Sequence, residues 1–103
     1  MRIDFFGDRI FIYTPKGEVI DLPAGATSID FAYAIHSEIG NHLAGAKVNG
    51  KLVRLQDKLH SGDTIELIIQ KKAKPHTDWL NEVKTASAKS KIRRALRQQS
   101  KPQ

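Results

Sequence analysis

One segment with helical periodicity, residues 28–39, lies between two groups of short β-forming segments. This order constrains the fold more than any other feature of the sequence. The first group comprises residues 9–14 and 18–22, which are rich in β-branched and aromatic side chains. Pro15-Lys16-Gly17 separates them. Because proline presets a turn and glycine tolerates positive φ, the two segments predict a β-hairpin.

The helical segment has start and stop signals and an apolar stripe. Thr27 or Ser28 can cap its N-terminus, and Asp30 in the first turn suits the helix dipole. Gly40 fits a left-handed C-cap. Apolar side chains recur at the spacing of one helix face, at Ile29, Ala32, Tyr33, Ile35 and Ile39. We therefore expect one amphipathic helix over residues 28–39.

The second group comprises residues 43–48, 51–54 and 64–69. Asn49-Gly50 between the first two is a strong hairpin signal. The apolar density of residues 64–69 indicates a central, well-buried strand. In a ββαββ order, the helix must cover one face of a single mixed sheet. We therefore expect an α+β fold of the β-grasp, or ubiquitin-like, type, with the first and last strands side by side at the sheet centre.

Charge divides the chain unevenly. Residues 1–70 carry seven Lys/Arg against nine Asp/Glu, whereas residues 71–103 carry ten against two. A basic tail attracts polyanions such as nucleic acid, but it is equally well explained as a solvated linker helix. Its narrow apolar face suggests a helix that needs a partner. We expect an N-terminal lead-in (1–8), a β-grasp domain (9–72) and a basic helical connector (73–103).

Several classes of function find no support in the sequence. There are no cysteines, and the four histidines show no metal-ligand spacing. No phosphate-binding loop or nucleophile motif is present. We therefore expect no catalytic residues, no metal and no cofactor in this segment. Apolar runs are far shorter than the roughly 20 residues that a membrane span needs, so we expect a cytoplasmic protein without a membrane segment.

Two aromatic residues have both structural and functional interpretations. His36 is expected in the last turn of the helix, where it either packs partly on Tyr33 or offers its ring to a ligand. Such a ring can stack on a base or bond a 2′-hydroxyl. Trp79, in a short helix that Thr77 is expected to cap, either anchors the tail to the body or contacts a partner.

The sequence also resembles a known family. Residues 10–27 read IFIYTPKGEVIDLPAGAT and residues 30–40 read DFAYAIHSEIG, which resemble the TGS domain of RelA/SpoT-type (p)ppGpp synthetase/hydrolases. GAKVNGKLV at 45–53 and GDTIE at 62–66 fit the same pattern. So do segments of the tail, KPHTDWL at 74–80 and TASAKSKI at 85–92.

The resemblance implies a regulatory module of a larger stringent-response enzyme. The parent would be a GTP pyrophosphokinase or (p)ppGpp hydrolase whose catalytic domains lie N-terminal to this segment. In ribosome-bound members, the TGS domain meets the 3′ CCA end of uncharged tRNA, and the histidine of the family motif falls on His36. We take His36 as the main candidate contact, with Lys16, His42 and Lys47 as weaker candidates for phosphate.

Two other interpretations remain open at this point. In some members of the family, the same domain meets acyl carrier protein, so the surface could bind that protein or another domain of the parent. The segment could also serve only as a structural spacer between catalytic and regulatory domains. The basic tail would then begin the connector to later regulatory domains.

Overall fold

The computed structural model describes residues 9–100. The predicted lead-in, residues 1–8, and the last three residues of the predicted connector lie outside the described residues. The first two strands, β1 (Arg9–Tyr13) and β2 (Val19–Pro23), pair antiparallel. The turn between them contains Gly17 at φ 92°, which confirms the predicted hairpin. Ile12 on its inner face is fully buried, whereas Phe11 on its outer face is exposed.

The remaining strands form a separate antiparallel sheet in the order β4-β3-β5. They are β3 (Leu43–Val48), β4 (Lys51–Val53) and β5 (Ile65–Ile69). Asn49 and Gly50 both have positive φ, as a type I′ hairpin turn requires, which confirms the second predicted hairpin.

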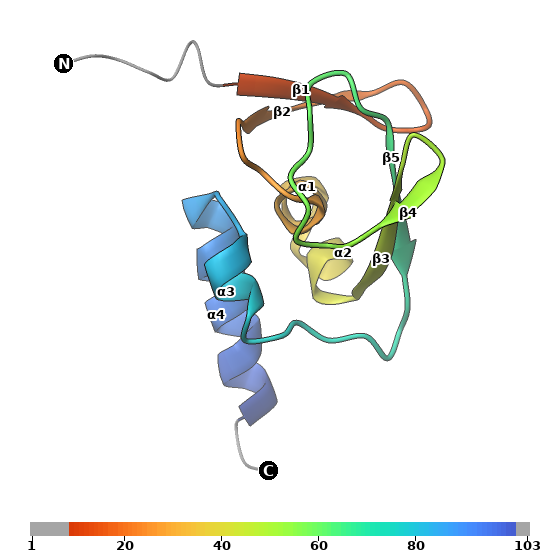
Figure 1. The fold of residues 1–103 in the computed structure, drawn as a ribbon. Helices are drawn as coiled ribbons and strands as arrows, with labels where there is room; N and C mark the ends of the chain where they lie inside the picture. Colours follow the sequence, from red (N-terminus) through yellow and green to blue (C-terminus); the bar gives the residue numbers. More distant parts are fainter. Residues whose placement is uncertain (1–8, 101–103) are drawn as a thin grey trace, which may run out of the picture.

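The expectation of one continuous sheet with the first and last strands at its centre is wrong in detail. β1 belongs to a different sheet from β5, but it runs beside the residues that lead into β5, with a parallel bridge between Tyr13 and Thr64. The Gly62 amide donates to the Phe11 carbonyl over 2.8 Å. The Tyr13 amide donates to the Asp63 carbonyl over 2.8 Å. The central strand of the three-stranded sheet is β3, and Ile69 at the end of β5 is exposed. The mixed β-grasp arrangement therefore stands, with two sheets joined at one corner (Figure 1).

The predicted helix over 28–39 is two helices, α1 (Ser28–Ile35) and α2 (Ser37–Asn41). Thr27 and Asp30 cap α1 reciprocally, which confirms Thr27 as the cap. His36 breaks the helix because its backbone is extended, with φ −170° and ψ 147°.

Gly40 is not a C-cap, and its role comes from close packing. It lies within α2, and a Cβ at this position would lie 2.4 Å from the ring of Tyr33. Tyr33 is itself fully buried. Only glycine therefore allows α2 to pack this closely on α1.

The tail folds back onto the domain. α3 (Trp79–Glu82) and α4 (Ala86–Ser100) pack on α1 on the side away from the sheets (Figure 1). Asp78, not Thr77, precedes α3, and its side chain makes no capping bond. The apolar face of α4 finds its partner within the chain, because Ala88 and Ile92 join the buried cluster around Tyr33. None of the helices within residues 9–100 is long and apolar enough to cross a membrane.

The packing of Gly40 gives a testable prediction. Gly40→Ala is expected to lower the free energy of unfolding by about 1–3 kcal/mol, because the new methyl group overlaps a buried ring. Urea unfolding measures the change. Gly45→Ala is the matched control, because the nearest atom to its Cβ would be the flexible end of the Ile68 side chain, at 3.3 Å. Equal stability of the two variants would contradict this packing.

Candidate RNA-contact surface

His36 occupies the corner between α1 and α2, with an exposed side chain. Its Nδ1 accepts a hydrogen bond from the Glu38 amide over 3.0 Å and so caps α2. The sequence predicted this side chain in the last turn of one longer helix. In the structure it instead acts at the start of α2. Because Nδ1 is the acceptor, Nε2 carries the hydrogen in the neutral ring. Nε2 has no hydrogen-bond partner among residues 9–100, so this donor is available to a ligand.

Buried contacts hold this corner in place. The Tyr33 hydroxyl donates to Asn41 Oδ1 over 2.8 Å, which ties α2 to α1. Burial raises the pKa of the Tyr33 phenol, so the hydroxyl stays a donor. Lys91 Nζ on α4 donates to the Tyr33 carbonyl over 3.1 Å, near the C-terminal end of α1. The His36 ring is therefore carried on a backbone fixed from both sides.

Lys16 lies at a hollow of about 270 Å³ between the β1–β2 turn, α1 and β5. Its apolar walls include Phe31, Ile35 and Leu67. Ile35, the last residue of α1, directly precedes His36. The hollow that Lys16 lines therefore reaches the end of α1 at which His36 lies. Lys16 and the acidic Glu18 both line this mainly apolar hollow, and an apolar hollow with a few polar groups suits a planar ligand.

His42 and Lys47 have different surroundings from His36. His42 is half-buried, with Nδ1 3.2 Å from the Ala73 carbonyl and Nε2 3.5 Å from Glu38 Oε1. Both ring nitrogens therefore contact groups of the same chain, which ties α2 to the segment after β5. Lys47 is exposed on β3, where its neighbour Ala46 faces the core. Because side chains alternate along a strand, Lys47 lies on the sheet face away from α1, and the structure does not bring it to His36.

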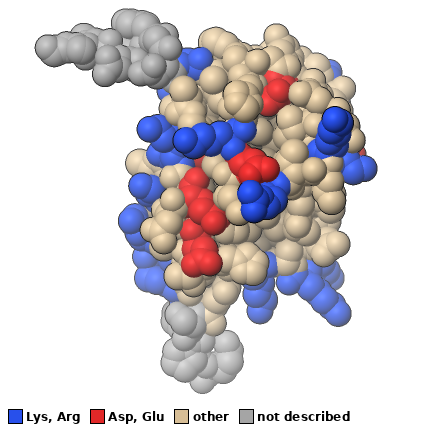
Figure 2. Space-filling model, viewed as in Figure 1, with Lys and Arg blue, Asp and Glu red and all other residues tan. Residues whose placement is uncertain are grey.

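The sequence reasoning missed the contribution of α4 to this surface. Lys91, Arg94 and Gln98 lie on one side of α4 and line a hollow against α2. The signal that could have revealed this contribution was the spacing of these three residues, three and four positions apart, which places them on one helix face. Figure 2 shows Lys and Arg side chains along the edge that α4 forms in Figure 1, with acidic side chains beside them. Among residues 9–100, no three His, Asp or Glu side chains form a group that could hold a metal ion.

Comparisons with known proteins find relatives along nearly the whole chain. The chain is 50% identical over 101 residues to a GTP pyrophosphokinase of Myxococcus xanthus, which covers 98% of this chain and 13% of the relative. It is 46% identical to the GTP pyrophosphokinase of Escherichia coli (strain K12) over 105 residues. It is 44% identical to the guanosine-3′,5′-bis(diphosphate) 3′-pyrophosphohydrolase of Aquifex aeolicus over 101 residues. These two comparisons cover 98% of this chain and 14% of each relative.

A solved structure shows the same fold at low identity. It is a GTP binding protein from Pyrococcus horikoshii OT3, with a TM-score of 0.57 and 18% identity, over 60% of this chain and 21% of that chain. The TGS domain family model matches residues 10–69, which covers the helices α1 and α2 and all five strands apart from Arg9. The match confirms the resemblance seen in residues 10–40, and the matched segment is a TGS domain and not a catalytic domain. The chain therefore belongs to the TGS domain family.

Proposed function

We propose that this chain is the regulatory TGS domain of a RelA/SpoT-type stringent-response enzyme and that it senses the 3′ CCA end of uncharged tRNA on the ribosome. The observation that supports the proposal best is the state of His36. Its ring is exposed, its Nδ1 is engaged in capping α2, and its Nε2–H is available as a donor. The parent would synthesise or hydrolyse (p)ppGpp in the cytoplasm with domains that lie outside this chain.

The chemistry of a single-stranded RNA end fits such a surface. Unstacked bases are bound by stacking on flat side chains and by hydrogen bonds to their edges and 2′-hydroxyls. The His36 ring supplies a flat face together with an N–H donor. Lys16, at the hollow beside the end of α1, supplies a positive charge for a nearby phosphate.

His36→Asn is the variant that tests this role. Asparagine keeps a side-chain oxygen that can cap α2 but removes the aromatic ring. Because stacking on one side chain contributes about 1–3 kcal/mol per base, we expect at least about a fivefold loss of affinity for a short RNA ending in CCA. NMR titration of the labelled chain measures both the affinity and the residues that shift.

The control is His60→Asn, which changes another exposed histidine in the loop before β5. We expect the His60 variant to bind like the wild type. If His36→Asn also binds like the wild type while its amide spectrum shows a folded α2, the assignment of His36 as an RNA contact is wrong.

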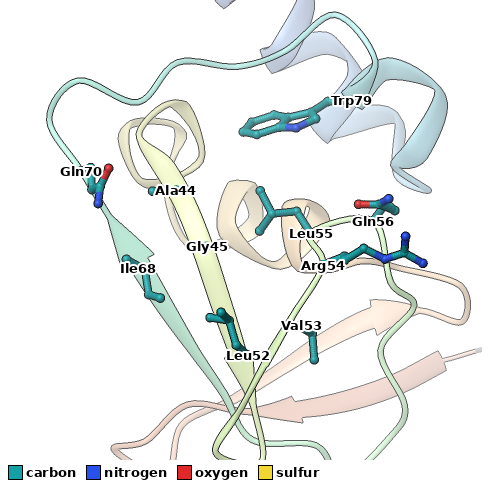
Figure 3. Close-up of a pocket in the computed structure, with 10 residues that line it drawn as sticks. All are labelled: Ala44, Gly45, Leu52, Val53, Arg54, Leu55, Gln56, Ile68, Gln70 and Trp79. Carbon is teal, nitrogen blue, oxygen red and sulfur yellow. The ribbon is translucent and has the colours of Figure 1, made fainter.

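A protein-interaction role is the second candidate, because a second surface favours it. A hollow of about 530 Å³ lies at the edge of the three-stranded sheet below Trp79 (Figure 3). Its walls include Gly45, Ile68 and Leu52, and Leu52 is 70% exposed. With Arg54 at the same hollow, this surface could take an apolar side chain of an acidic partner such as acyl carrier protein. Leu52→Ser would then weaken protein binding and leave RNA binding unchanged.

A further inference from the structure

A polar hollow of about 290 Å³ lies between α2 and α4, beside the candidate RNA contact. From α2, Ser37 and Asn41 line it, and Ser37 directly follows His36. From α4, Lys91, Arg94 and Gln98 line it. The hollow therefore joins the segment matched by the TGS family model to a helix that lies beyond the match.

The lining is rich in hydrogen-bond donors. Asn41 uses its Oδ1 to accept from the Tyr33 hydroxyl, which leaves its Nδ2 amide to donate. Lys91 gives one hydrogen bond to the Tyr33 carbonyl and has two further N–H groups. Arg94 is exposed and always charged, and its guanidinium can bind two oxygens of one phosphate at once. Several donors around one concave surface are the chemistry of an anion site.

Glu38 is the one acidic side chain that lines this hollow. It is 72% exposed, and its Oε1 lies 3.5 Å from Nε2 of His42, at the far end of α2. Two basic side chains, Lys91 and Arg94, line the hollow against this one acidic side chain, so the net charge of the lining is positive.

The hollow is preformed because α4 is fixed on the domain. Ala88 and Ile92 are buried in the cluster around Tyr33. The backbone amides of Lys84 and Thr85, just before α4, donate to the buried carboxylate of Asp30. Lys91 and Arg94 are thus presented on a rigid helix, which lowers the entropy lost when a ligand binds.

We propose that this α2–α4 hollow is a phosphate subsite for the backbone of the single-stranded RNA whose end contacts His36. The inference rests on the proposed function and extends it in two ways. It adds Arg94 as the main phosphate ligand, with Lys91 and Asn41 as supporting donors. It also makes α4 part of the RNA-binding surface.

Arg94→Gln tests the subsite on the full chain, with a seven-nucleotide single-stranded RNA ending in CCA as the probe. We expect affinity to fall on the order of fivefold, because a charge-assisted contact with phosphate is lost. The slope of log affinity against log salt should become shallower by about 0.7, the value for one phosphate of a single strand. Arg93→Gln is the matched control, because it removes the same charge from the neighbouring exposed position, which does not line the hollow.

A second arm replaces one backbone phosphate of the RNA at a time by an uncharged methylphosphonate. At one phosphate position, we expect the replacement to weaken RNA binding by the wild type. The same replacement should leave the affinity of Arg94→Gln unchanged. Equal losses for Arg93→Gln and Arg94→Gln would overturn the subsite and leave only a general attraction to a basic helix. A phosphoserine peptide that binds the hollow as tightly as the RNA would also overturn the assignment.

The outcomes separate the subsite from the function on which it rests. If His36→Asn abolishes RNA binding and Arg94→Gln does not change it, the proposed function stands and the subsite is wrong. If the wild-type chain does not bind the RNA at all, both are overturned. Amide spectra of each variant show whether the fold is retained.

Discussion

Trp79→Ala is expected to lower the free energy of unfolding by about 3–5 kcal/mol, the usual cost of truncating a buried tryptophan. Trp79 is only 4% exposed and lies edge-on to Tyr33, with ring centroids 6.4 Å apart. It belongs to the cluster that holds α3 and α4 on α1. This packing supports Trp79 as an anchor of the tail, one of the two interpretations that the sequence left open.

Urea unfolding followed by far-UV circular dichroism measures this loss, because the helical signal does not depend on the tryptophan. Trp79→Phe, which refills most of the space, should lose clearly less stability than Trp79→Ala. Leu52→Ala is an exposed control and is expected within about 0.5 kcal/mol of the wild type. A Trp79→Ala variant as stable as Leu52→Ala would mean that the tail does not depend on this side chain.

Features set by local chemistry could be predicted from the sequence. Gly17 and the pair Asn49-Gly50 adopt the positive φ that their hairpin turns require. Thr27 caps α1 because its hydroxyl and the Asp30 carboxylate lie three residues apart. Each of these signals depends on a few neighbouring residues, so no knowledge of the tertiary structure was needed.

Features set by contacts between distant residues could not be predicted. The apolar spacing runs from Ile29 to Ile39 without interruption, so the break at His36 left no signal in the periodicity. The break lets α2 turn and place Gly40 against the ring of Tyr33. The division into two sheets likewise depends on a contact between distant residues, the bridge between Tyr13 and Thr64.

The candidate site shows the same division. His36 was singled out by its place in the predicted helix, and the family resemblance favoured it as a contact. The structure adds the capping bond that leaves its Nε2–H available. Arg94 could not be singled out, because the sequence shows it only as one of many basic residues in a tail. Its position beside α2 depends on how α4 docks, and that docking begins at Asp30, more than 50 residues earlier in the chain.

Asp30 joins the two ends of the described fold. Its carboxylate is buried and accepts hydrogen bonds from the amide and hydroxyl of Thr27, at the start of α1. It also accepts from the amide of Lys84 and from the amide and hydroxyl of Thr85. The Thr85 hydroxyl in turn accepts from the Ala88 amide, in the first turn of α4. One carboxylate therefore organises the N-terminal ends of both α1 and α4.

Asp30→Ala is accordingly expected to lower the free energy of unfolding by about 3–5 kcal/mol. Several buried N–H and O–H groups lose their acceptor at once, and each unsatisfied group costs about 1–3 kcal/mol before water or relaxation compensates. Urea unfolding measures the total loss. Hydrogen exchange should also show the amides of Lys84, Thr85 and Ala88 losing protection more than those of β3.

Asp78→Ala is the matched control, because Asp78 also precedes a helix but its side chain makes no capping bond. It should change stability by no more than about 0.5 kcal/mol. Asp30→Asn should fall between the two, since the amide keeps one acceptor oxygen but turns an N–H group toward other donors. If Asp30→Ala lost less than 1 kcal/mol and α4 kept its protection, the apolar cluster alone would fix α4. The α2–α4 hollow would then form without the carboxylate.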